Sequence, residues 1–283
     1  MVIIRVKGGM GNQLFQYALY RKYQVMGKKT AVDLQYYKSA KEERAFREYE
    51  LPLIGLQPEQ AQKEDIVRLA GKESILNKAV RRMGLRKSYI REPDLSYHSE
   101  ILHKENAYLN GYWQCDKYFK DIRQVLLDEI QYPLDREQIN DQLYKRICTT
   151  QSVCVTIRRG DYVSASRFRD RYYVCDASYF EKGMKKAQNI LGEVTFFAFS
   201  DDIEWVKENV EFPGPVFFER GDDPIYEKMR LMSSCKHFII SNSSFSWWVQ
   251  YLSTYSDKCV FAPRNWYADG TKTDIYQDNW IYV

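Results

Sequence analysis

The feature that most constrains this chain is its alternation of short apolar segments with segments of helical periodicity. Residues 2–6 read as a strand, a glycine turn follows, and Leu14, Phe15, Ala18 and Leu19 then recur at the spacing of a helix. A second strand-like segment, TAVDL, closes this first β-α-β unit. Alternating strands and helices favour a parallel sheet that helices cover on both faces. The sequence therefore predicts an α/β fold.

The alternation is weaker in the middle of the chain and resumes in the second half. Residues 36–106 are polar, tyrosine-rich and basic, and the best helix candidate among them covers 59–71. Further on, we expect a short strand near 108–110 and helices over 122–130 and 136–148, then strands over 153–157, 194–200 and 237–241 with helices over 176–191 and through Leu252. A domain boundary near residue 145 would divide the chain into domains 1–145 and 146–283. No proline- or glycine-rich linker marks it, so the halves should pack closely.

Composition narrows the partners and the compartment. Lysine and arginine number 42 against 38 aspartate and glutamate residues, and this net charge of +4 permits anionic small molecules but does not indicate nucleic acid. No secretion signal precedes the first strand, and no apolar run reaches the roughly 18 residues of a membrane span. We therefore expect a cytoplasmic protein. Its cysteines are expected to be reduced core residues, at positions 115, 148, 154, 175, 235 and 259.

Polar loops follow three of the strands expected in the second half. RRGDY comes after Ile157, SDD after Phe199 and SNSSFS after Ile240. Ligands of open α/β sheets bind beyond the carboxyl ends of the strands, where such loops gather. The sequence therefore predicts a binding site at this edge of the second sheet.

Arg158 and Arg159 are the strongest ligand-binding candidates in these loops. Arginine presents a planar fork of donors that matches phosphate oxygens, and a charge at the end of a buried strand is costly unless an anion or a carboxylate meets it. If the extended backbone persists, the two side chains point to opposite sides, so that one can face a ligand and the other a structural carboxylate such as Asp161. The alternative is a salt bridge alone.

Two expected helix starts can offer backbone donors to a phosphate. Residues 241–244, SNSS, precede the helix through Leu252 and can instead be an ordinary N-cap. The segment GGMGNQ at 8–13 opens the first helix, and glycines there would let backbone amides approach a pyrophosphate. By itself this second signal is weak, because it lacks the lysine of a P-loop and does not match G-x-G-x-x-G.

Two pairs of aspartates raise the question of a nucleoside or a metal. Asp201 and Asp202 at a strand end can accept hydrogen bonds from a nucleobase or ribose, or can cap the helix that contains Trp205. Neither this pair nor Asp222 and Asp223 has the one-residue spacing common at sugar-nucleotide metal sites, and the three histidines show no metal-ligand spacing. We expect no metal cofactor.

The basic stretch NKAVRRMGLRKSYIRE, residues 77–92, has two interpretations. The simpler one is a solvated face. The functional one is a peripheral contact with an anionic membrane surface, such as the inner face of the plasma membrane, that carries a lipid-linked acceptor.

Six blocks taken together resemble the α-1,2-fucosyltransferases of glycosyltransferase family 11. They occur in family order over nearly the whole chain: GGMGNQLFQYA, GYWQCDKYF, RRGDYV, FSDDIEW, LMSSCKHFIISNSSFSWW and APRNWY. The resemblance implies a GT-B-like fold, in which two Rossmann-type domains have parallel sheets that face each other across a cleft. It also implies a GDP-β-L-fucose donor and metal-independent transfer, with inversion, onto the 2-hydroxyl of a galactose in a glycan. Bacterial-type surface polysaccharide synthesis is the implied setting.

The same resemblance implies roles for individual residues. Arg158 and Arg159 would hold the donor pyrophosphate, Asp201 or Asp202 would approach the guanosine, and Thr156 stands where the family usually has a histidine. Threonine can form hydrogen bonds but cannot stack or carry charge as histidine can. Further phosphate contacts would come from Gly9, Gly11 and Asn12 in the first domain and from Asn242, Ser243 and Ser244 in the second.

Catalysis would need charge neutralisation on the leaving phosphate more than its protonation, and arginines with backbone amides can supply it. Arg159 is the main candidate for that role. Asp161 is the candidate base for the attacking hydroxyl, or else the orienting partner of an arginine. Two alternatives stay open: transfer of another GDP-linked deoxysugar, and a non-catalytic protein that only binds a GDP-sugar.

Overall fold

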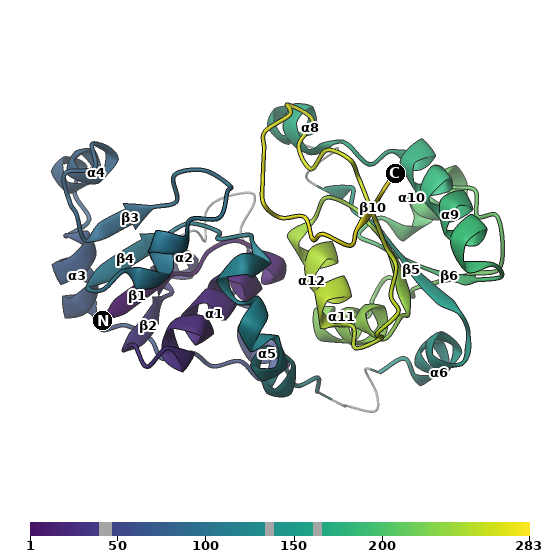
Figure 1. Cartoon of the computed structure of the whole chain (residues 1–283), viewed down its shortest axis with the longest axis horizontal. Coiled ribbons are helices and arrows are strands. Elements are labelled where there is room, and N and C mark those ends of the chain that lie inside the picture. The colour runs from purple at the N-terminus through teal and green to yellow at the C-terminus, as the bar shows by residue number, and fades with distance from the viewer. Residues whose placement is uncertain (40–46, 134–138, 161–165) are drawn as a thin grey trace. The chain divides into compact units, whose positions relative to one another are not determined.

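The computed structural model describes residues 1–39, 47–133, 139–160 and 166–283. The chain divides into two compact units, which are shown in Figure 1. The first unit contains residues 1–131 and the short segment Thr273–Ile275, and the second contains residues 132–272 and 276–283. The division therefore comes before the expected boundary near residue 145, which falls within helix α6 (Asp141–Thr149) of the second unit.

The first unit is built on a parallel sheet with the strand order β2-β1-β4-β3. Its strands are β1 (Val2–Arg5), β2 (Thr30–Asp33), β3 (Tyr89–Arg91) and β4 (Ala107–Asn110). Helices α1 (Met10–Val25) and α3 (Lys63–Ala70) lie on opposite sides of this sheet (Figure 1). Ile66, Leu69 and Ala70 of α3 are buried together with Ile3 and Tyr108. These two strand residues therefore point to the α3 side of the sheet.

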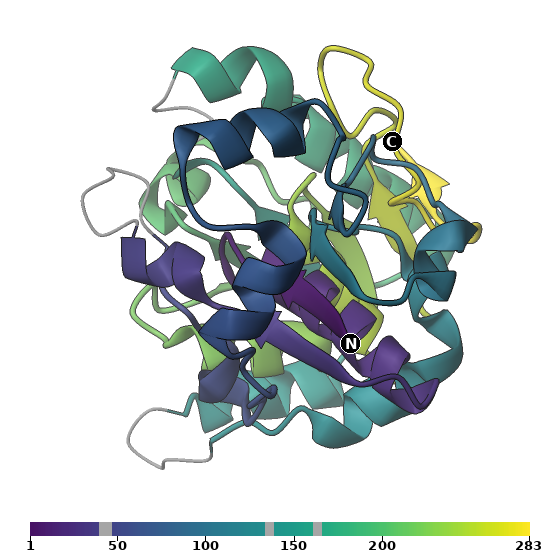
Figure 2. The ribbon, with the colours of Figure 1, turned by 90° about the vertical axis from the view of Figure 1, so that its left-hand side faces the viewer.

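Short elements complete the first unit, which Figure 2 brings toward the viewer. Helices α2 (Gln35–Ser39), α4 (Ile75–Arg82) and α5 (Arg123–Glu129) accompany four 3-10 turns, η1 (Leu51–Ile54), η2 (Ser99–His103), η3 (Asp116–Tyr118) and η4 (Lys120–Ile122). Helix α4 differs from the others in burying none of its residues.

The second unit is built on a larger parallel sheet with the strand order β10-β9-β8-β5-β6-β7. Its strands are β5 (Ser152–Ile157), β6 (Thr195–Ser200), β7 (Val216–Phe218), β8 (His237–Ile240), β9 (Val260–Ala262) and β10 (Ile281–Tyr282). All six residues of β5 are buried, as expected for a strand that has a neighbour on each side and helices over both faces.

Helices of two kinds pack on this sheet. Helix α9 (Ala177–Leu191) is amphipathic and buries Phe180 and Met184 in a core with Val153, Val155 and Phe196. Helix α12 (Ser244–Leu252) is apolar almost all round, and seven of its nine residues are buried. The remaining helices of the unit are α6, α8 (Ser166–Tyr172), α10 (Ile203–Asn209) and α11 (Ile225–Ser233).

The predicted α/β class, with two Rossmann-type units that each contain a parallel sheet, is confirmed. Each expected strand and helix is present at the predicted place, although α3 and α6 begin later than expected. The sequence did not predict β3, β7, β9 and β10, which have two or three residues each. Among the described residues, no helix is long and apolar enough to cross a membrane.

Candidate functional site

The loops after β5, β6 and β8 meet at one edge of the second sheet, as predicted. Thr156 pairs with Phe199 of β6 and Ile240 of β8 in the parallel register, and Ile157 pairs with Ser200. All three strands therefore end at the same level. Their next residues begin the polar loops that were expected to form a binding site.

Arg158 and Asp201 are joined across this edge. The Arg158 guanidinium lies 2.7 Å from one carboxylate oxygen of Asp201. The other carboxylate oxygen accepts a hydrogen bond of 2.8 Å from the backbone N–H of Arg159. Asp201 thus fixes both the first arginine and the backbone that carries the second.

Arg159 is held by a different set of groups. Its Nε lies 3.2 Å from Asp202 Oδ2, and its Cζ lies 3.5 Å from the centroid of the Trp205 ring. The side chain is 15% exposed. Its two terminal nitrogens donate no hydrogen bond to any residue of the described ranges, so no described partner has to be displaced before they meet an anion. Among the described residues, Asp201 and Asp202 are carboxylates that meet the two arginines. Asp161 lies outside the described residues, so its predicted role as an arginine's partner stays a prediction.

The space around Gly160 explains why a glycine follows the two arginines. A Cβ atom at this position would come within 2.4 Å of Asp201 Oδ2 and 3.2 Å of Arg158 Nη2. Real side chains do not approach that closely, so any other residue would push the Arg158–Asp201 pair apart. The glycine therefore belongs to the packing of this ion pair.

Asp202 has the structural role that the sequence left open. It is the N-cap of α10, where its carboxylate accepts from the backbone N–H of Trp205 at 3.3 Å. It also pairs with Arg159. A contact of Asp201 or Asp202 with a nucleoside stays a prediction, and both carboxylates are engaged with arginines in this structure.

The N-terminus of α12 is capped by a neutral group. The Ser243 hydroxyl accepts from the backbone N–H of Phe245 at 3.3 Å. The half-buried hydroxyl of Ser244 makes no hydrogen bond within the described part of the chain. The positive end of this helix dipole therefore has an uncharged cap and an available hydroxyl beside it.

Thr156 and Asn242 lie beneath this loop. The Thr156 hydroxyl accepts from the backbone N–H of Ser241 at 3.1 Å, and the residue is 2% exposed. The Asn242 amide donates to the carbonyl oxygens of Tyr172 and Trp266, both at 2.9 Å. These two side chains shape the loop, and their direct contact with a ligand stays a prediction.

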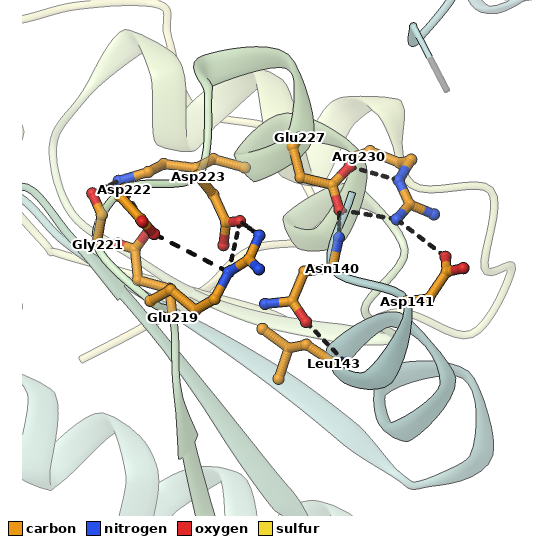
Figure 3. Close-up of polar contacts among 11 residues, drawn as sticks. Asn140, Asp141, Leu143, Glu219, Gly221, Asp222, Asp223, Glu227 and Arg230 are labelled. Carbon is orange, nitrogen blue, oxygen red and sulfur yellow. Dashed lines mark hydrogen bonds and ion pairs between the residues drawn. The ribbon is translucent and has the colours of Figure 1, made fainter. Parts of the chain in front are cut away.

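Acidic residues after β7 adjoin the same edge, which was not predicted from the sequence. The Glu219 carboxylate accepts from the backbone N–H of Ser200 at 2.6 Å and pairs with Lys228 at 2.8 Å. Burial raises the pKa of Glu219. Asp223 is fully buried and pairs with Arg220 (Figure 3). The acid-rich run FERGDD was the available signal, but β7 is too short to show which strand it follows.

Figure 3 also shows a buried ion pair that is structural. Glu227 and Arg230, one turn apart on α11, form two hydrogen bonds of 2.7 and 2.8 Å. Glu227 further accepts from the backbone N–H of Asn140 at 2.7 Å, and Arg230 lies 3.9 Å from Asp141. The pair therefore attaches α11 to the start of α6.

The glycine loop of the first unit is tightly held from within its own unit. Gly8 has φ +84°, which favours glycine, and a Cβ there would lie 2.6 Å from Asn12 Nδ2. The Gly8 carbonyl accepts from the side chains of Gln13 at 2.9 Å and Tyr37 at 2.8 Å. Asn12 in turn accepts from Gln114 at 2.7 Å.

A carboxylate already occupies the start of α1. Gly9 is the N-cap residue, and the backbone N–H of Met10 donates to Glu50 Oε2 at 2.8 Å. Gln13 accepts from the backbone N–H of Glu50 at 2.8 Å, which fixes this acid in place. Burial raises the pKa of Glu50. The roles predicted for Gly9, Gly11 and Asn12 in phosphate binding stay predictions, and the Glu50 carboxylate opposes them.

Within the described ranges, no group of three or more His, Cys, Asp or Glu side chains is arranged to hold a metal ion. Independence from a metal stays a prediction.

Comparison with known proteins gives one family model that matches residues 83–283, glycosyl transferase family 11. The O-antigen biosynthesis glycosyltransferase WbnK of Escherichia coli is 29% identical, with 98% of each chain covered. The alpha-1,2-colitosyltransferase of Escherichia coli is 31% identical over 100% of this chain and 99% of its own. Human galactoside alpha-(1,2)-fucosyltransferase 1 is 29% identical over 36% of this chain and 28% of its own.

Solved structures show the same fold. The fucosyltransferase NodZ from Bradyrhizobium has a TM-score of 0.51 and 15% identity, with 88% of this chain and 91% of that chain covered. NodZ alpha-1,6-fucosyltransferase soaked with GDP-fucose has a TM-score of 0.50 and 16% identity, with 89% and 92% covered. The predicted GT-B-like class is thereby confirmed.

Proposed function

Because the chain belongs to glycosyl transferase family 11, we propose that it transfers L-fucose from GDP-β-L-fucose to the 2-hydroxyl of a galactose in a glycan, with inversion at the sugar. The names of its relatives support this proposal, since they include α-1,2-fucosyltransferases and an O-antigen glycosyltransferase. The setting we propose is the assembly of a bacterial surface polysaccharide.

The observation that carries the proposal is the pairing of two arginines with an uncharged helix start at one sheet edge. The terminal nitrogens of Arg159 have no hydrogen-bond partner among the described residues, while Asp202 and Trp205 hold the rest of the guanidinium. The N-terminus of α12 adds backbone donors and the Ser244 hydroxyl. Such an edge suits a diphosphate, because both the guanidinium fork and the helix dipole favour the negative charge.

In the reaction we propose, the hydroxyl oxygen of the acceptor attacks C1 of the donor sugar while the bond from C1 to the GDP oxygen breaks. Negative charge then grows on the departing diphosphate, and Arg159 stabilises it. Arg158 lies at the same sheet edge, where Asp201 orients it, and adds a second positive charge. The proton of the attacking hydroxyl goes to a base, for which Asp161 is our candidate.

A second candidate activity is transfer of a different deoxysugar. The chain is 31% identical to the alpha-1,2-colitosyltransferase and 29% identical to WbnK, and both matches cover nearly the whole chain. The diphosphate contacts would be the same for either donor, so this edge of the sheet does not discriminate between them.

The test is a GDP-release assay on the purified chain with GDP-fucose and a panel of galactose-terminated oligosaccharides, followed by identification of the linkage. GDP-colitose and GDP-mannose serve as competing donors. The proposal predicts GDP release that depends on both GDP-fucose and a galactose acceptor and yields an α-1,2 product. Release with GDP-colitose alone would establish the second activity, and tight GDP binding without release from any donor would indicate a binding protein.

A further inference from the structure

Helix α4 of the first unit presents its apolar side to solvent. Ile75 is 89% exposed and Leu76 75%, and Met83 at the end of the helix is 63% exposed. Ile75, Ala79 and Met83 follow the four-residue spacing of one helix face, which Leu76 widens. An amphipathic helix of a globular protein normally buries such a stripe. Figure 1 shows α4 at the periphery of its unit.

Lys78, Arg81 and Arg82 of α4 line a cationic cavity of about 860 Å³. This cavity lies on the α3 side of the sheet, where the strand residues change from apolar to charged. Ile3 packs against α3, while Arg5, two residues further along β1, lines the cavity. Tyr89 and Arg91 on β3 are both in its lining. The cavity therefore begins where the apolar packing under α3 gives way to charged side chains.

Cations outnumber carboxylates in the lining. The cationic residues are Arg5, Lys63, Lys72, Lys78, Arg81, Arg82 and Arg91, and the carboxylates are Asp33 and Glu73. Asp33 accepts from the Tyr108 hydroxyl at 2.6 Å and from a backbone N–H at 2.8 Å. Glu73 lies 2.9 Å from Arg81 and 4.0 Å from Lys78. Both carboxylates are thus already engaged.

Five of these cations form no ion pair with any described residue, namely Arg5, Lys63, Lys72, Arg82 and Arg91. Arg5 is the innermost case, because its Nε is buried and has no hydrogen-bond partner in the described part of the chain. A buried guanidinium nitrogen without an acceptor is costly unless a ligand supplies one. The cavity is therefore suited to an anion.

We propose that α4 and this cavity form a docking site for an anionic phospholipid surface. The stripe of Ile75, Leu76 and Met83, with the 67% exposed Leu85 after it, would enter the boundary between headgroups and acyl chains. Lys72 and Arg82 would contact neighbouring lipid phosphates, and one phosphate would reach Arg5 in the cavity. Cations that have no ion-pair partner in the described part of the chain, beside an exposed apolar stripe, match a surface that is anionic outside and apolar beneath.

The experiment is flotation of the full chain with vesicles of phosphatidylcholine alone and of phosphatidylcholine with phosphatidylglycerol at about a 2:1 ratio. We expect binding only to the anionic vesicles. Ile75→Ser, Leu76→Ser and Met83→Ser combined should lower the bound fraction by about tenfold or more, because the apolar contact is lost. Lys72→Gln combined with Arg82→Gln should weaken it by a similar factor. These positions are exposed, so folding should be unaffected.

Arg68→Gln is the matched control, because Arg68 lies on α3, pairs with Asp65 and does not line the cavity. It should bind anionic vesicles as the wild type does. Equal binding to neutral and anionic vesicles, or no binding to either, would overturn the proposal. The readout is vesicle binding rather than turnover, so the outcome does not depend on the proposed transferase activity.

Two further arms separate a lipid from other occupants. If inorganic phosphate raises the melting temperature of the wild type but not of Arg5→Gln, and vesicles are not bound, the site takes a free phosphate compound and the lipid assignment is wrong. If the chain self-associates in size-exclusion chromatography, the triple serine variant is monomeric and vesicles are not bound, the stripe is a protein contact. That result would also overturn the proposal.

Discussion

The N-termini of helices α1 and α12 occupy similar places in the two units but are capped by different groups. Each follows a buried parallel strand and a short loop, and the N-terminus of each carries the positive end of the helix dipole. At α1, the half-buried carboxylate of Glu50 accepts from the first helical N–H. At α12, the cap is the hydroxyl of Ser243.

This difference indicates which of the two helix N-termini can bind a phosphate. A helix N-terminus attracts an anion because unpaired N–H groups and the dipole act together. A carboxylate at α1 already supplies the negative charge, whereas α12 has a neutral cap and no acidic residue in its first turn. Two arginines stand at the same sheet edge as α12 and reinforce the contrast.

The largest expected effect comes from Arg159→Lys. The substitution keeps one positive charge and removes the fork of donors, so turnover should fall by roughly 10²-fold or more if Arg159 stabilises the leaving diphosphate. The affinity for GDP should fall less than the turnover. Steady-state kinetics paired with thermal unfolding are the measurement. A lower melting temperature with unchanged turnover per folded molecule would mean that the contacts with Asp202 and Trp205 are the whole role of this arginine.

A smaller effect is expected from Ser244→Ala at the start of α12. This hydroxyl has no partner among the described residues, so its removal should leave the melting temperature unchanged. If it donates to the diphosphate, the affinity for GDP should fall by about tenfold, the scale of one hydrogen bond to a charged group. Isothermal titration calorimetry with GDP measures the change. The exposed Ser256→Ala in the same unit is the control, and equal affinities for the two variants would remove Ser244 from the site.

Glu50→Gln tests the other side of the comparison and should change little. Glutamine can still accept from Met10, so the loop should keep its shape and the affinity for GDP should stay within about twofold. Tighter GDP binding by the variant would show instead that the start of α1 is an anion site, which Glu50 normally blocks.

The stability of Glu50→Gln should depend on pH in a defined direction. Burial raises the pKa of Glu50, so the folded protein holds this proton more tightly than the unfolded chain does, and stability is lost as the pH rises through the folded pKa. At pH 7 the free energy of unfolding of the variant should therefore equal that of the wild type or exceed it slightly, by about 1 kcal/mol or less. The difference should shrink as the pH is lowered toward the ordinary carboxyl pKa of 4.5. A gap that widens on acidification would contradict this account.

Removal of metals should have no effect on transfer. In the proposed reaction the arginines and helix amides stabilise the leaving diphosphate, so excess EDTA should leave turnover unchanged within error. A loss of activity that manganese or magnesium restores would show that these groups do not suffice.

The sequence predicted the sheets and the meeting of the three polar loops because both follow from local patterns. Alternation of strands and helices implies parallel sheets, and parallel strands end at one edge. The short strands β3 and β7 were not predicted, because three residues carry too little periodicity to separate them from loop.

The partners of the charged groups were beyond the sequence for a different reason. Glu50 reaches Met10 across 40 positions, and Asp201 reaches Arg159 across 42. Nothing local to either segment specifies these pairs, because they arise only when the fold brings distant loops together. For Arg158 and Arg159 the sequence predicted that an anion or a carboxylate meets the charge and offered Asp161 as an example, but it did not point to Asp201 or Asp202 as ion-pair partners.

The most direct test of the central claim is amide hydrogen exchange, measured by mass spectrometry on the full chain with and without saturating GDP. We predict slower exchange in peptides that cover 157–160 and 241–246, at the ends of β5 and β8, and no change in a peptide that covers 8–13. Protection of 8–13 with no change at 241–246 would place the phosphates at the start of α1 and would contradict the account.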